Sequence, residues 1–531
     1  MDSYFTKVAY KGAFGTDNWT KCWCEFDPKN ADYSKPINYT SNISDFTFTV
    51  TDNVVNFTAP TGTNYSYKWN FGNFKTSTEQ NPKIAYSALG TYTVLLTVTN
   101  ERGCSKTISK QVSITSGTKE IAINTDITTN TTWKNDKIYR LTGSACLYVR
   151  NNATLTIEPG TIIKGDPSAL VITRGSKLIA QGTEKQPIVF TSAKAAGERV
   201  VGDWGGIALL GAAKVNCPGG QCLLEGGCDP TLSVYGGTDD NDNSGILTYV
   251  RIEYAGIAFQ PNNELNSLTL AGVGKGTTLN HIQTSFGGDD AYEWFGGAVD
   301  SKYLIAYKTV DDMFDTDFGY TGRNQFSLGI SDPQIADVSG SNGFEADNDA
   351  QGTLNTPISN GTFANTTIFG PKSDPSVSIN TNFKRGAHLR RSTRQDHFNS
   401  VITGFPFGMR VESANTENAY LTQNELKIKG NLLAGVTKVL DSTSTNSSAV
   451  LAKLLVDGNN VYPNVSDMKF TNSSNSTPDM RPLATSPLLS FPNSQEVYTD
   501  AFFTKVNYIG AFDANTNWTN CWAEWNPQNA D

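Results

Sequence analysis

The sequence predicts an all-β protein in which a parallel β-helix follows a smaller β-sandwich. Thr, Ser, Asn, Gly and aromatic residues dominate the 531 residues, while runs of helix-forming residues are scarce. Short apolar segments recur at a spacing of 22 residues, which suits one coil of a parallel β-helix with three short strands and three turns. A near-identical segment at each end of the chain adds a repeat that spans almost the whole molecule.

The charge and hydropathy of the chain exclude two classes of partner. The net charge is −9, and the 42 Lys and Arg residues are scattered without a polybasic run, so a nucleic-acid partner is not expected. No apolar stretch approaches the roughly 20 residues that cross a bilayer, so the sequence predicts a protein that does not span a membrane. The first ten residues lack the basic start and apolar core of a signal peptide, which fits either an internal protein or a mature fragment.

The cysteines favour disulfides over a zinc site. There are eight cysteines and three histidines, and the cysteines show no convincing zinc-ligand spacing. We expect disulfides, notably within CPGGQCLLEGGC at residues 217–228. Because disulfides persist in oxidising surroundings, the sequence predicts an extracellular or cell-surface location.

The two chain ends carry Trp-rich segments of almost the same sequence. NWTKCWCEFDPKNAD at residues 18–32 returns as NWTNCWAEWNPQNAD at residues 517–531, and FTKVAYKGAF at residues 5–14 returns as FTKVNYIGAF at residues 503–512. Eighteen of these twenty-five positions are identical, and we assign terminal segments to residues 1–35 and 496–531. A segment docked at the open end of a β-helix would serve as a cap and as a joint between successive units of the same protein. An internal duplication within one globular monomer is the alternative.

A β-sandwich is expected between the first terminal segment and the β-helix, at residues 36–116. Its marks are the run Trp69, Asn70, Phe71 and Gly72 and the alternating strand GTYTVLLTVTN at residues 90–100. These features resemble the PKD domain, an immunoglobulin-like β-sandwich. The resemblance implies a spacer module. Asparagines at positions 70 and 73 stand where the family usually has aspartates, which argues against calcium there.

The β-helix is expected at residues 117–495. VRNNATLTIEPGT at residues 149–161 aligns with VITRGSKLIAQGT at residues 171–183, and residues 280–293 align with residues 302–315, each at a shift of 22. Coils about 4.8 Å apart then give on the order of twelve coils in a rod roughly 60 Å long. The inward apolar column is expected to include Leu155, Ile157, Leu170 and Ile179. Asparagines in FANTTIFG, HFNSVITG and GNLLAG are compatible with an Asn ladder at one turn.

Several longer stretches resemble a known family. GDWGGIALLG, DNSGILTYVRIEYAG, DDAYEWFGG and DDMFDTDFGYTG, among others, are similar to large bacterial secreted or cell-surface proteins with a β-helix and PKD modules. The resemblance implies a right-handed parallel β-helix preceded by an immunoglobulin-like PKD β-sandwich, and export that is often by the type IX route. In this family the β-helix typically closes with a segment like the one at residues 502–522.

Acidic residues gather in two runs one coil apart. At a spacing of 22 residues, Asp289, Asp290 and Glu293 stack on Asp311, Asp312 and Asp315, and Asp317, Glu345, Asp347 and Asp349 follow. Like charges about 4.8 Å apart repel by roughly 1 kcal/mol in water and by about 3–4 kcal/mol at an effective dielectric constant of 20, so a counter-charge is needed. Calcium, with its six to eight oxygen ligands, is one candidate for a structural cofactor. Arginines 385, 390, 391 and 394 are the other.

A second, weaker calcium pattern lies in DDNDNSG at residues 239–245. Asp240 and Asp242 stand at the first two ligand positions of half a calcium loop, but Arg251 occupies the twelfth position, where an acid is expected. An Asx-rich turn explains the same residues.

The function predicted from these observations is not enzymatic. No serine-hydrolase, zinc-protease or phosphate-binding motif is present, and no catalytic or cofactor-binding residues are assigned beyond the metal candidates. The sequence predicts an extracellular structural or adhesive protein, an adhesin that assembles head to tail into a filament or tandem array. Its partners would be further copies or successive units of the same protein, and cell-surface glycans. The alternative is a calcium-dependent carbohydrate-active enzyme, because polysaccharide lyases with this fold use lateral carboxylates, or a glycan-binding protein.

Overall fold

The computed structural model of the chain contains two compact units, Met1–Lys119 and Glu120–Ala530. The residues that the structure describes are 20, 22–24, 28–30, 40, 43–73, 75–86, 89–101, 103–115, 120–260, 263–372, 376–441, 446–473 and 477–530. Most of the first Trp-rich segment lies outside the described residues. No helix within them is long and apolar enough to cross a membrane.

The smaller unit is a β-sandwich of two antiparallel sheets. One sheet has the order β1-β2-β5 and the other has the order β4-β3-β6-β7. The strands are β1 Thr47–Thr51, β2 Val54–Thr58, β3 Ser66–Asn70, β4 Thr76–Ser77, β5 Lys83–Ala85, β6 Gly90–Thr99 and β7 Ser105–Ile114. The prediction of an immunoglobulin-like β-sandwich before the β-helix is confirmed.

Alternation along the strands builds the core of the β-sandwich. In β6, Val94, Leu96 and Val98 are buried, because every second side chain of a strand points to the same face. Trp69 is fully buried, and its indole N–H donates a 2.9 Å hydrogen bond to the backbone carbonyl of Glu79. A disulfide between Cys22 and Cys104 ties the first terminal segment to this unit.

The larger unit is a parallel β-helix whose strands stack in three ladders. Ladder A contains β8 Glu120–Ile123, β10 Ile138–Leu141, β13 Ile162–Gly165, β16 Ile188–Ser192, β20 Gly245–Glu253, β24 Thr278–Ser285, β26 Ser301–Tyr307, β29 Leu328–Ile330, β32 Thr367–Phe369, β35 Val401–Thr403, β38 Leu432–Ala434 and β40 Asn460–Tyr462. These twelve strands of the described chain match the expected number of coils.

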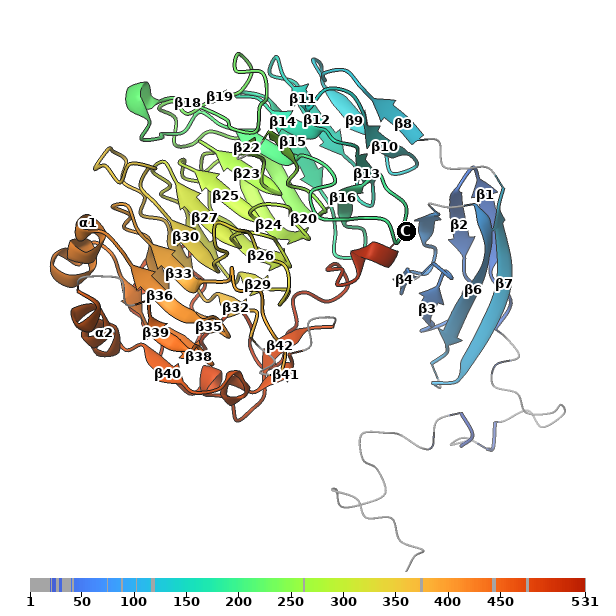
Figure 1. The fold of residues 1–531 in the computed structure, drawn as a ribbon. Coiled ribbons are helices and arrows are strands. Elements are labelled where there is room, and N and C mark those ends of the chain that lie inside the picture. Colours follow the sequence, from blue (N-terminus) through green and yellow to red (C-terminus); the bar gives the residue numbers. More distant parts are fainter. Residues whose placement is uncertain are drawn as a thin grey trace, which may run out of the picture. The chain divides into compact units, whose positions relative to one another are not determined.

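The other two ladders complete each coil. Ladder B contains β9 Thr131–Trp133, β12 Thr154–Ile157, β15 Lys177–Gln181, β28 Arg323–Gln325, β31 Thr362–Ala364, β34 Asp396–Phe398 and β37 Ile428–Lys429, and the long strands β20, β24 and β26 extend into it. Ladder C contains β11 Cys146–Val149, β14 Ala169–Ile172, β17 Gly206–Leu210, β23 Leu268–Ala271, β25 Tyr292–Phe295, β27 Phe314–Asp317, β30 Phe344–Ala346, β33 Arg385–Leu389, β36 Phe407–Val411 and β39 Lys438–Leu440. Figure 1 shows the strands side by side along the unit, from β8 and β9 at one end to β40 at the other.

Short hairpins and helices connect or flank the strands of the three ladders. The hairpin strands are β18 Cys222–Leu223, β19 Val234–Tyr235, β21 Ala258–Gln260, β22 Asn263–Glu264, β41 Phe470–Asn472 and β42 Asp479–Pro482. The helices are η1 Pro218–Gly220, α1 Ala414–Asn418, η2 Ala419–Gln423, α2 Ser447–Val456, η3 Val465–Met468, η4 Pro487–Leu489, η5 Glu496–Thr499 and η6 Pro527–Asn529. Val450 and Leu454 of α2 join the main core, so this helix covers the coils at the β40 end (Figure 1).

The register of the first coils differs by one residue from the expected one. Leu155 lies beside Leu178, an offset of 23 residues. Leu155, Ile157 and Leu170 are buried as expected, but Ile179 is only half-buried because a one-residue slip exchanges the two faces of a strand. The expected offset of 22 holds between β24 and β26 and between β25 and β27. It is lost where a longer loop enters a coil, as between β27 and β30, where Phe314 lies beside Phe344 at an offset of 30 residues.

One turn carries a ladder of residues with positive φ. Tyr249, His281, Tyr303, Phe326, Asn365 and Asn399 occupy equivalent places between ladders B and A, with φ between +50° and +63°. Asn365 and Asn399 confirm part of the expected Asn ladder, since Asn tolerates this conformation. The third asparagine, Asn431, lies one residue further on, because Gly430 takes the ladder position with φ +69°.

The second terminal segment lies along the side of the β-helix. Phe512 and Trp522 pack with outward residues of ladder A such as Ile305 and Leu328 in one buried cluster. Trp522 meets the ring of Tyr249 edge-on at a centroid distance of 5.8 Å. The expectation that this segment caps the open end of the β-helix is therefore wrong, because the outer face of ladder A is apolar and needs a cover.

Candidate functional site

The outer face of ladder C carries the acidic residues. Strand pairing places one outward column in register, made of Thr269, Glu293, Asp315, Glu345, His388 and Arg410. The alternating residues Tyr292, Phe314 and Phe344 face the core. Glu293 and Asp315 are therefore neighbours on adjacent strands, as the 22-residue spacing predicts.

The turns before these strands add a second row of carboxylates. Asp290 and Asp312 stand two residues before β25 and β27, and the backbone N–H of Asp312 donates a 2.7 Å hydrogen bond to Asp290. The carboxylate of Asp312 in turn accepts a hydrogen bond from the backbone N–H of Asn342. Each carboxylate of this row is thus oriented by the next coil.

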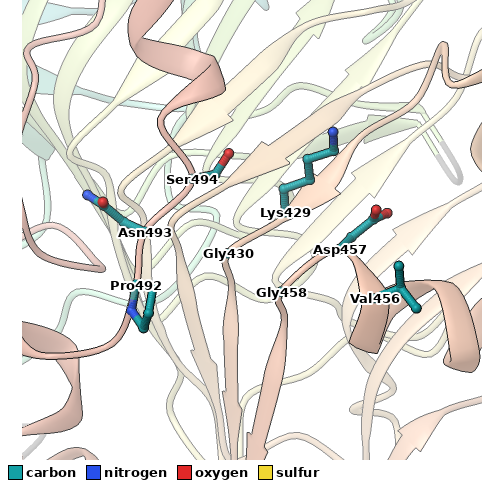
Figure 2. Close-up of a pocket in the computed structure, with 8 residues that line it drawn as sticks. All are labelled: Lys429, Gly430, Val456, Asp457, Gly458, Pro492, Asn493 and Ser494. Carbon is teal, nitrogen blue, oxygen red and sulfur yellow. The ribbon is translucent and has the colours of Figure 1, made fainter.

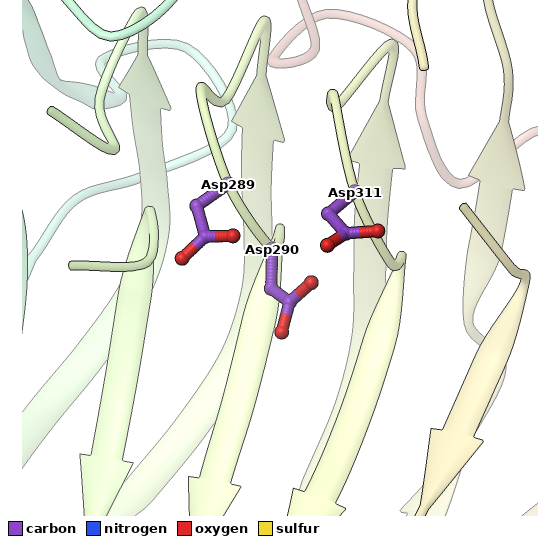
Figure 3. A group of neighbouring side chains, drawn as sticks. All are labelled: Asp289, Asp290 and Asp311. Carbon is purple, nitrogen blue, oxygen red and sulfur yellow. The ribbon is translucent and has the colours of Figure 1, made fainter. Parts of the chain in front are cut away.

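Three overlapping groups of carboxylates could hold a metal ion. Ligand atoms lie within 4.8 Å of one another in the groups Asp289, Asp290 and Asp311; Asp290, Glu293 and Asp315; and Asp312, Asp315 and Glu345. Figure 3 shows the first group, in which Asp289 and Asp290 lie on one turn and Asp311 lies on the neighbouring one. We call these seven residues the carboxylate cluster. Because Asp290 and Asp315 each belong to two groups, the cluster is continuous.

Burial makes the charged form of these carboxyl groups costly. It raises the pKa of Asp290, Glu293, Asp312 and Asp315 well above the usual range, and neighbouring carboxylates raise it further. Burial also raises the pKa of Asp311 to about 7. A cation in the cluster would remove this cost, because it favours the charged form.

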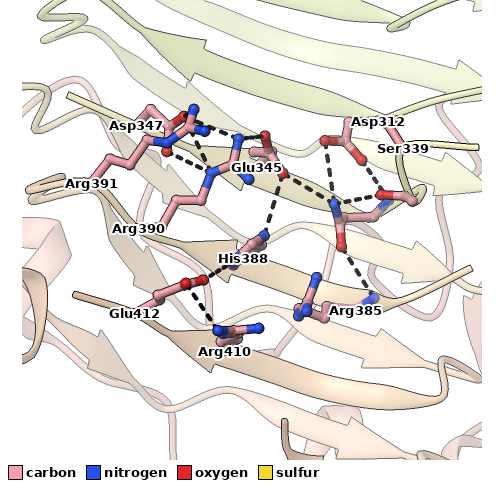
Figure 4. Close-up of polar contacts among 12 residues, drawn as sticks. Asp312, Ser339, Glu345, Asp347, Arg385, His388, Arg390, Arg391, Arg410 and Glu412 are labelled. Atoms are coloured by element: carbon pink, nitrogen blue, oxygen red, sulfur yellow. Dashed lines mark hydrogen bonds and ion pairs between the residues drawn. The ribbon is translucent and has the colours of Figure 1, made fainter. Parts of the chain in front are cut away.

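Among the described residues, arginines pair with the side of the cluster that contains Glu345. Arg390 pairs with Glu345 and Asp347, and Arg391 donates to Asp347 at 2.7 Å (Figure 4). Among the ion pairs of the described chain, none involves Asp290, Glu293, Asp311, Asp312 or Asp315. The two alternatives from the sequence, a cation and arginine pairing, therefore apply to different parts of the acidic column.

The remaining basic residues of this face belong to a network of ion pairs on the strands that come after the cluster. His388 lies 2.7 Å from Glu412 and 3.3 Å from Glu345, and Arg410 lies 2.9 Å from Glu412 (Figure 4). Two of the arginines proposed as counter-charges pair elsewhere: Arg385 with Asp441 and Arg394 with Glu425.

Sequence reasoning missed the polar residues beside the carboxylate cluster, which are Ser339, Asn342 and, next to Glu293, Asn266. The side chain of Asn266 is 1 % exposed, and its amide N–H donates to the carboxylate of Glu293. The side-chain oxygen of Asn266 and the Oδ1 atom of Asp315 are buried without a hydrogen-bond partner among the described residues. Both are oxygen atoms of the kind that calcium accepts as ligands. Only the tertiary pairing of β23 with β25 places Asn266 next to the acidic runs.

The other candidate residues lie outside the carboxylate cluster. Asp317 follows Thr316 on β27. Burial raises the pKa of Asp317 to about 8. Asp349 accepts hydrogen bonds from the backbone N–H groups of Gln351 and Thr353, as in an Asx turn. Asp240 pairs with Lys214 at 2.7 Å, and Asp242 accepts from Ser244. None of these four aspartates belongs to the three metal-compatible groups found among the described residues.

A disulfide-bonded loop borders the cluster. Cys217 pairs with Cys222 inside the predicted cysteine segment, whereas Cys228 pairs with Cys146 at the start of β11. The loop packs on outward residues of ladder C as far as Phe295. The charge of Glu225 from this loop is among the causes that raise the pKa of Glu293, after burial.

A pocket near the end of the β-helix does not coincide with the cluster. It has a volume of about 340 Å³ and is lined by Lys429, Gly430, Val456, Asp457, Gly458, Pro492, Asn493 and Ser494 (Figure 2). Its two charged residues are already paired, Lys429 with Glu496 and Asp457 with Lys453. We therefore place the candidate site at the carboxylate cluster.

The fold and the carboxylate cluster define the class of this protein. It is a β-helix protein with a group of carboxylates on its lateral face. Residues 125–477 match the family model of the pectate-lyase-like β-helix domain, and residues 37–115 match the PKD domain model. The chain belongs to the pectate-lyase-like β-helix family. This membership overturns the expectation of a non-enzyme, because it points to a carbohydrate-active enzyme.

Two curated relatives match short stretches of the chain. The pre-pro-metalloprotease PrtV of Vibrio cholerae serotype O1 (strain M66-2) is 45% identical over 49 residues, and the collagenase ColA of Bacillus cereus is 52% identical over 50 residues. Each match covers 9% of this chain and 5% of the relative. The chain thus spans a small fraction of the length of these curated relatives.

Solved structures resemble each unit in turn. The PKD1 domain of V. cholerae PrtV is 35% identical, with 13% of this chain and 91% of that chain covered at a TM-score of 0.13. Pectate lyase Pel9A is 12% identical, with 75% of this chain and 97% of that chain covered at a TM-score of 0.29.

Proposed function

We propose that this chain is an extracellular, calcium-dependent enzyme that cleaves an acidic polysaccharide by a lyase-type reaction. The observation that carries the proposal is the carboxylate cluster on the outer face of ladder C, where five acids, three of them buried and two half-buried, lack basic partners among the described ion pairs. Three disulfides, Cys22–Cys104, Cys146–Cys228 and Cys217–Cys222, support an oxidising location.

Calcium suits the cluster better than magnesium does. Calcium accepts six to eight oxygen ligands in irregular geometry, whereas magnesium requires a near-ideal octahedron. The ligands would come from Asp290, Glu293, Asp312 and Asp315, with the free amide oxygen of Asn266 as a neutral donor.

The substrate class follows from the charge of the site. Bound calcium would supply positive charge that holds a sugar carboxylate and acidifies the adjacent C–H bond. Asp312 and Asp290 are held in place by backbone hydrogen bonds, so little reorganisation is needed when the site is filled. We therefore assign uronate-containing polysaccharides as the substrate.

The test separates binding from catalysis. Calcium binding to the full chain is measured by calorimetry, and cleavage of polygalacturonate and alginate is followed by the ultraviolet absorbance of the unsaturated product. We expect binding and cleavage to be lost together in Asp290→Asn and Asp312→Asn. The matched control Asp166→Asn, whose carboxylate pairs with Arg140 away from the cluster, should retain both. Calcium binding without cleavage of any uronate polymer would contradict the lyase, and no binding at all would contradict the metal site.

The terminal repeat supports a second proposal, head-to-tail association into a filament or tandem array. The Trp-rich segment occurs twice and carries apolar side chains suited to an interface. Sedimentation of the native protein over a wide concentration range should show growing assemblies, and a single species throughout would count against it.

A further inference from the structure

The two terminal segments share a local backbone structure where both are described. Cys22 and Cys521 occupy equivalent positions, and both have φ +71°. The backbone N–H of Cys24 donates to the carbonyl of Thr20 at 3.3 Å, and the N–H of Ala523 donates to the carbonyl of Thr519 at 3.2 Å. The turn around the cysteine is therefore the same in both copies.

Each copy uses a different side of this turn. In the first copy, Cys22 is bonded to Cys104 of the β-sandwich unit, and Trp23 is 63% exposed. In the second copy, Trp522 is 1% exposed against the β-helix, and Cys521 is an exposed free thiol. The cysteine side thus suits the β-sandwich unit, and the tryptophan side suits the β-helix.

In sequence, each copy retains the residues of the cysteine side and those of the tryptophan side. In the second copy the buried positions are Phe503, Ile509, Gly510, Ala511, Phe512, Thr519, Trp522 and Pro527. Seven of these eight residues recur in the first copy, and the exception is Lys11 in place of Ile509. The second copy likewise keeps a cysteine, Cys521, that serves no disulfide within its own chain.

We propose that Cys521 is the attachment point for the β-sandwich unit of a second molecule of this protein, where it forms a disulfide with Cys104 in place of Cys22. The segment would then bind its own β-helix through Trp522 and the next molecule through Cys521. This inference is independent of the proposed enzymatic activity.

The replacement of the Cys22–Cys104 disulfide by a Cys104–Cys521 disulfide is chemically balanced when a small thiol such as glutathione forms the intermediate mixed disulfides. The glutathione thiolate attacks the sulfur of Cys22, which is an exposed residue, the Cys22–Cys104 bond breaks, and Cys104 leaves as a thiolate. The Cys521 thiolate then takes glutathione from Cys22, which leaves as a thiolate. Finally the Cys104 thiolate attacks the Cys521 mixed disulfide and releases glutathione. The number of disulfides is unchanged, and no net oxidation occurs.

Competition within one chain limits the exchange. Cys22 is tethered to the same chain as Cys104, so its effective concentration is high and the closed monomer is favoured in dilute solution. Removing Cys22 should release Cys104 for Cys521 of a second molecule. The resulting contact joins two different surfaces and therefore propagates from molecule to molecule.

The test uses the full chain in a buffer of reduced and oxidised glutathione, with non-reducing electrophoresis and mass spectrometry of disulfide-linked peptides. In Cys22→Ser, where oxidised glutathione supplies the oxidant for two free thiols, we expect at least ten-fold more covalent oligomer than in the native protein. These oligomers should contain the Cys104–Cys521 peptide pair. The double variant Cys22→Ser, Cys521→Ser should remain monomeric, and Cys24→Ser should behave as the native protein does.

Two results would overturn the proposal. One is a Cys22→Ser protein, folded by circular dichroism, in which Cys521 stays a free thiol. The other is oligomers linked only through Cys521–Cys521 or Cys24. If Cys22→Ser does not fold, the native protein at high concentration with catalytic glutathione provides the same peptide readout.

Discussion

The backbone N–H of Asp312 donates a 2.7 Å hydrogen bond to the carboxylate of Asp290, which belongs to the preceding coil. The site is therefore built between coils, with Asp290 and Asp312 each oriented by a backbone N–H of the next coil. Such support holds like charges close together in a rigid sheet, which an isolated loop could not do. This support explains why the carboxylates of the cluster repel one another when no cation is bound.

Removing one acid should stabilise the metal-free protein and abolish its response to calcium. In Asp290→Asn, a buried carboxylate whose pKa is raised well above its usual range is replaced by a neutral amide of the same shape. We expect a higher melting temperature than that of the native protein in chelator at pH 8. We also expect less than a quarter of the native rise when calcium is added. Differential scanning calorimetry measures both, and an unchanged calcium response would exclude Asp290 as a ligand.

The metal-free protein should lose stability as the pH rises through neutrality. The pKa of Asp311 is raised to about 7, so its stabilising contribution is complete below its unfolded value near 3.8 and is lost as the pH rises through about 7. The loss should amount to a few kcal/mol, on the order expected from a shift of this size. Denaturant unfolding in chelator at pH 5 and pH 8 tests this, and saturating calcium should flatten the dependence.

Substituting Asn266 should weaken cation binding without unfolding the β-helix. Asn266→Ala removes a buried oxygen beside the cluster and the hydrogen bond to Glu293. We expect roughly 10-fold to 100-fold weaker calcium binding, the range typical of residues that support metal ligands. Asn342→Ala, which loses weaker contacts at 3.3–3.4 Å to Glu345 and Asp312, provides a graded comparison. Equal affinity in Asn266→Ala and the native protein would remove this residue from the site.

Acidification should weaken the fold through His281. Its ring is stacked between Tyr249 and Tyr303, at a centroid distance of 4.5 Å from each, and burial lowers its pKa to about 4. Because the folded pKa is depressed, the stabilisation is complete above the unfolded value of 6.5 and is lost as the pH falls toward 4. We expect a loss on the order of 2 kcal/mol after allowing for partial exposure.

His281→Phe provides the comparison for that pH dependence. Phe326 occupies the same ladder position in a later coil, so the substituted ring fits the same backbone conformation. The difference in unfolding free energy between pH 7 and pH 4 should be smaller in the variant. Identical pH profiles would assign the acid lability to other groups, such as the buried His397, whose pKa is lowered to about 3.

Trp522→Ala should release the second terminal segment while the β-helix stays folded. The substitution removes a ring that is 1% exposed, with an expected cost of about 3–5 kcal/mol. Trypsin should then cut at the exposed Lys505, and intact-mass analysis should show loss of the segment. Trp23→Ala, at the equivalent position of the first copy, should leave the cleavage rate unchanged. Protection of the segment in Trp522→Ala would mean that its other contacts suffice.

Much of the architecture follows from local sequence patterns. The 22-residue spacing aligns Glu293 with Asp315, and alternation in GTYTVLLTVTN identifies the core face of a sandwich strand. These features are local, because a residue's face in a strand depends on a period of two and each coil repeats the last. The same reasoning failed at Ile179, where one extra residue in the coil changed the register.

What the sequence by itself determined was therefore the strand content, the repeated coil and the stacking of the two acidic runs. Only the tertiary structure decided which acids find basic partners, as Asp347 does with Arg390 while Asp312 does not. It also placed Asn266 beside Glu293 and laid the second terminal segment along ladder A. These contacts join residues far apart in the chain, and no local period records which distant surfaces remain uncovered when the coils are stacked. Packing of apolar faces and the cost of buried charge select them.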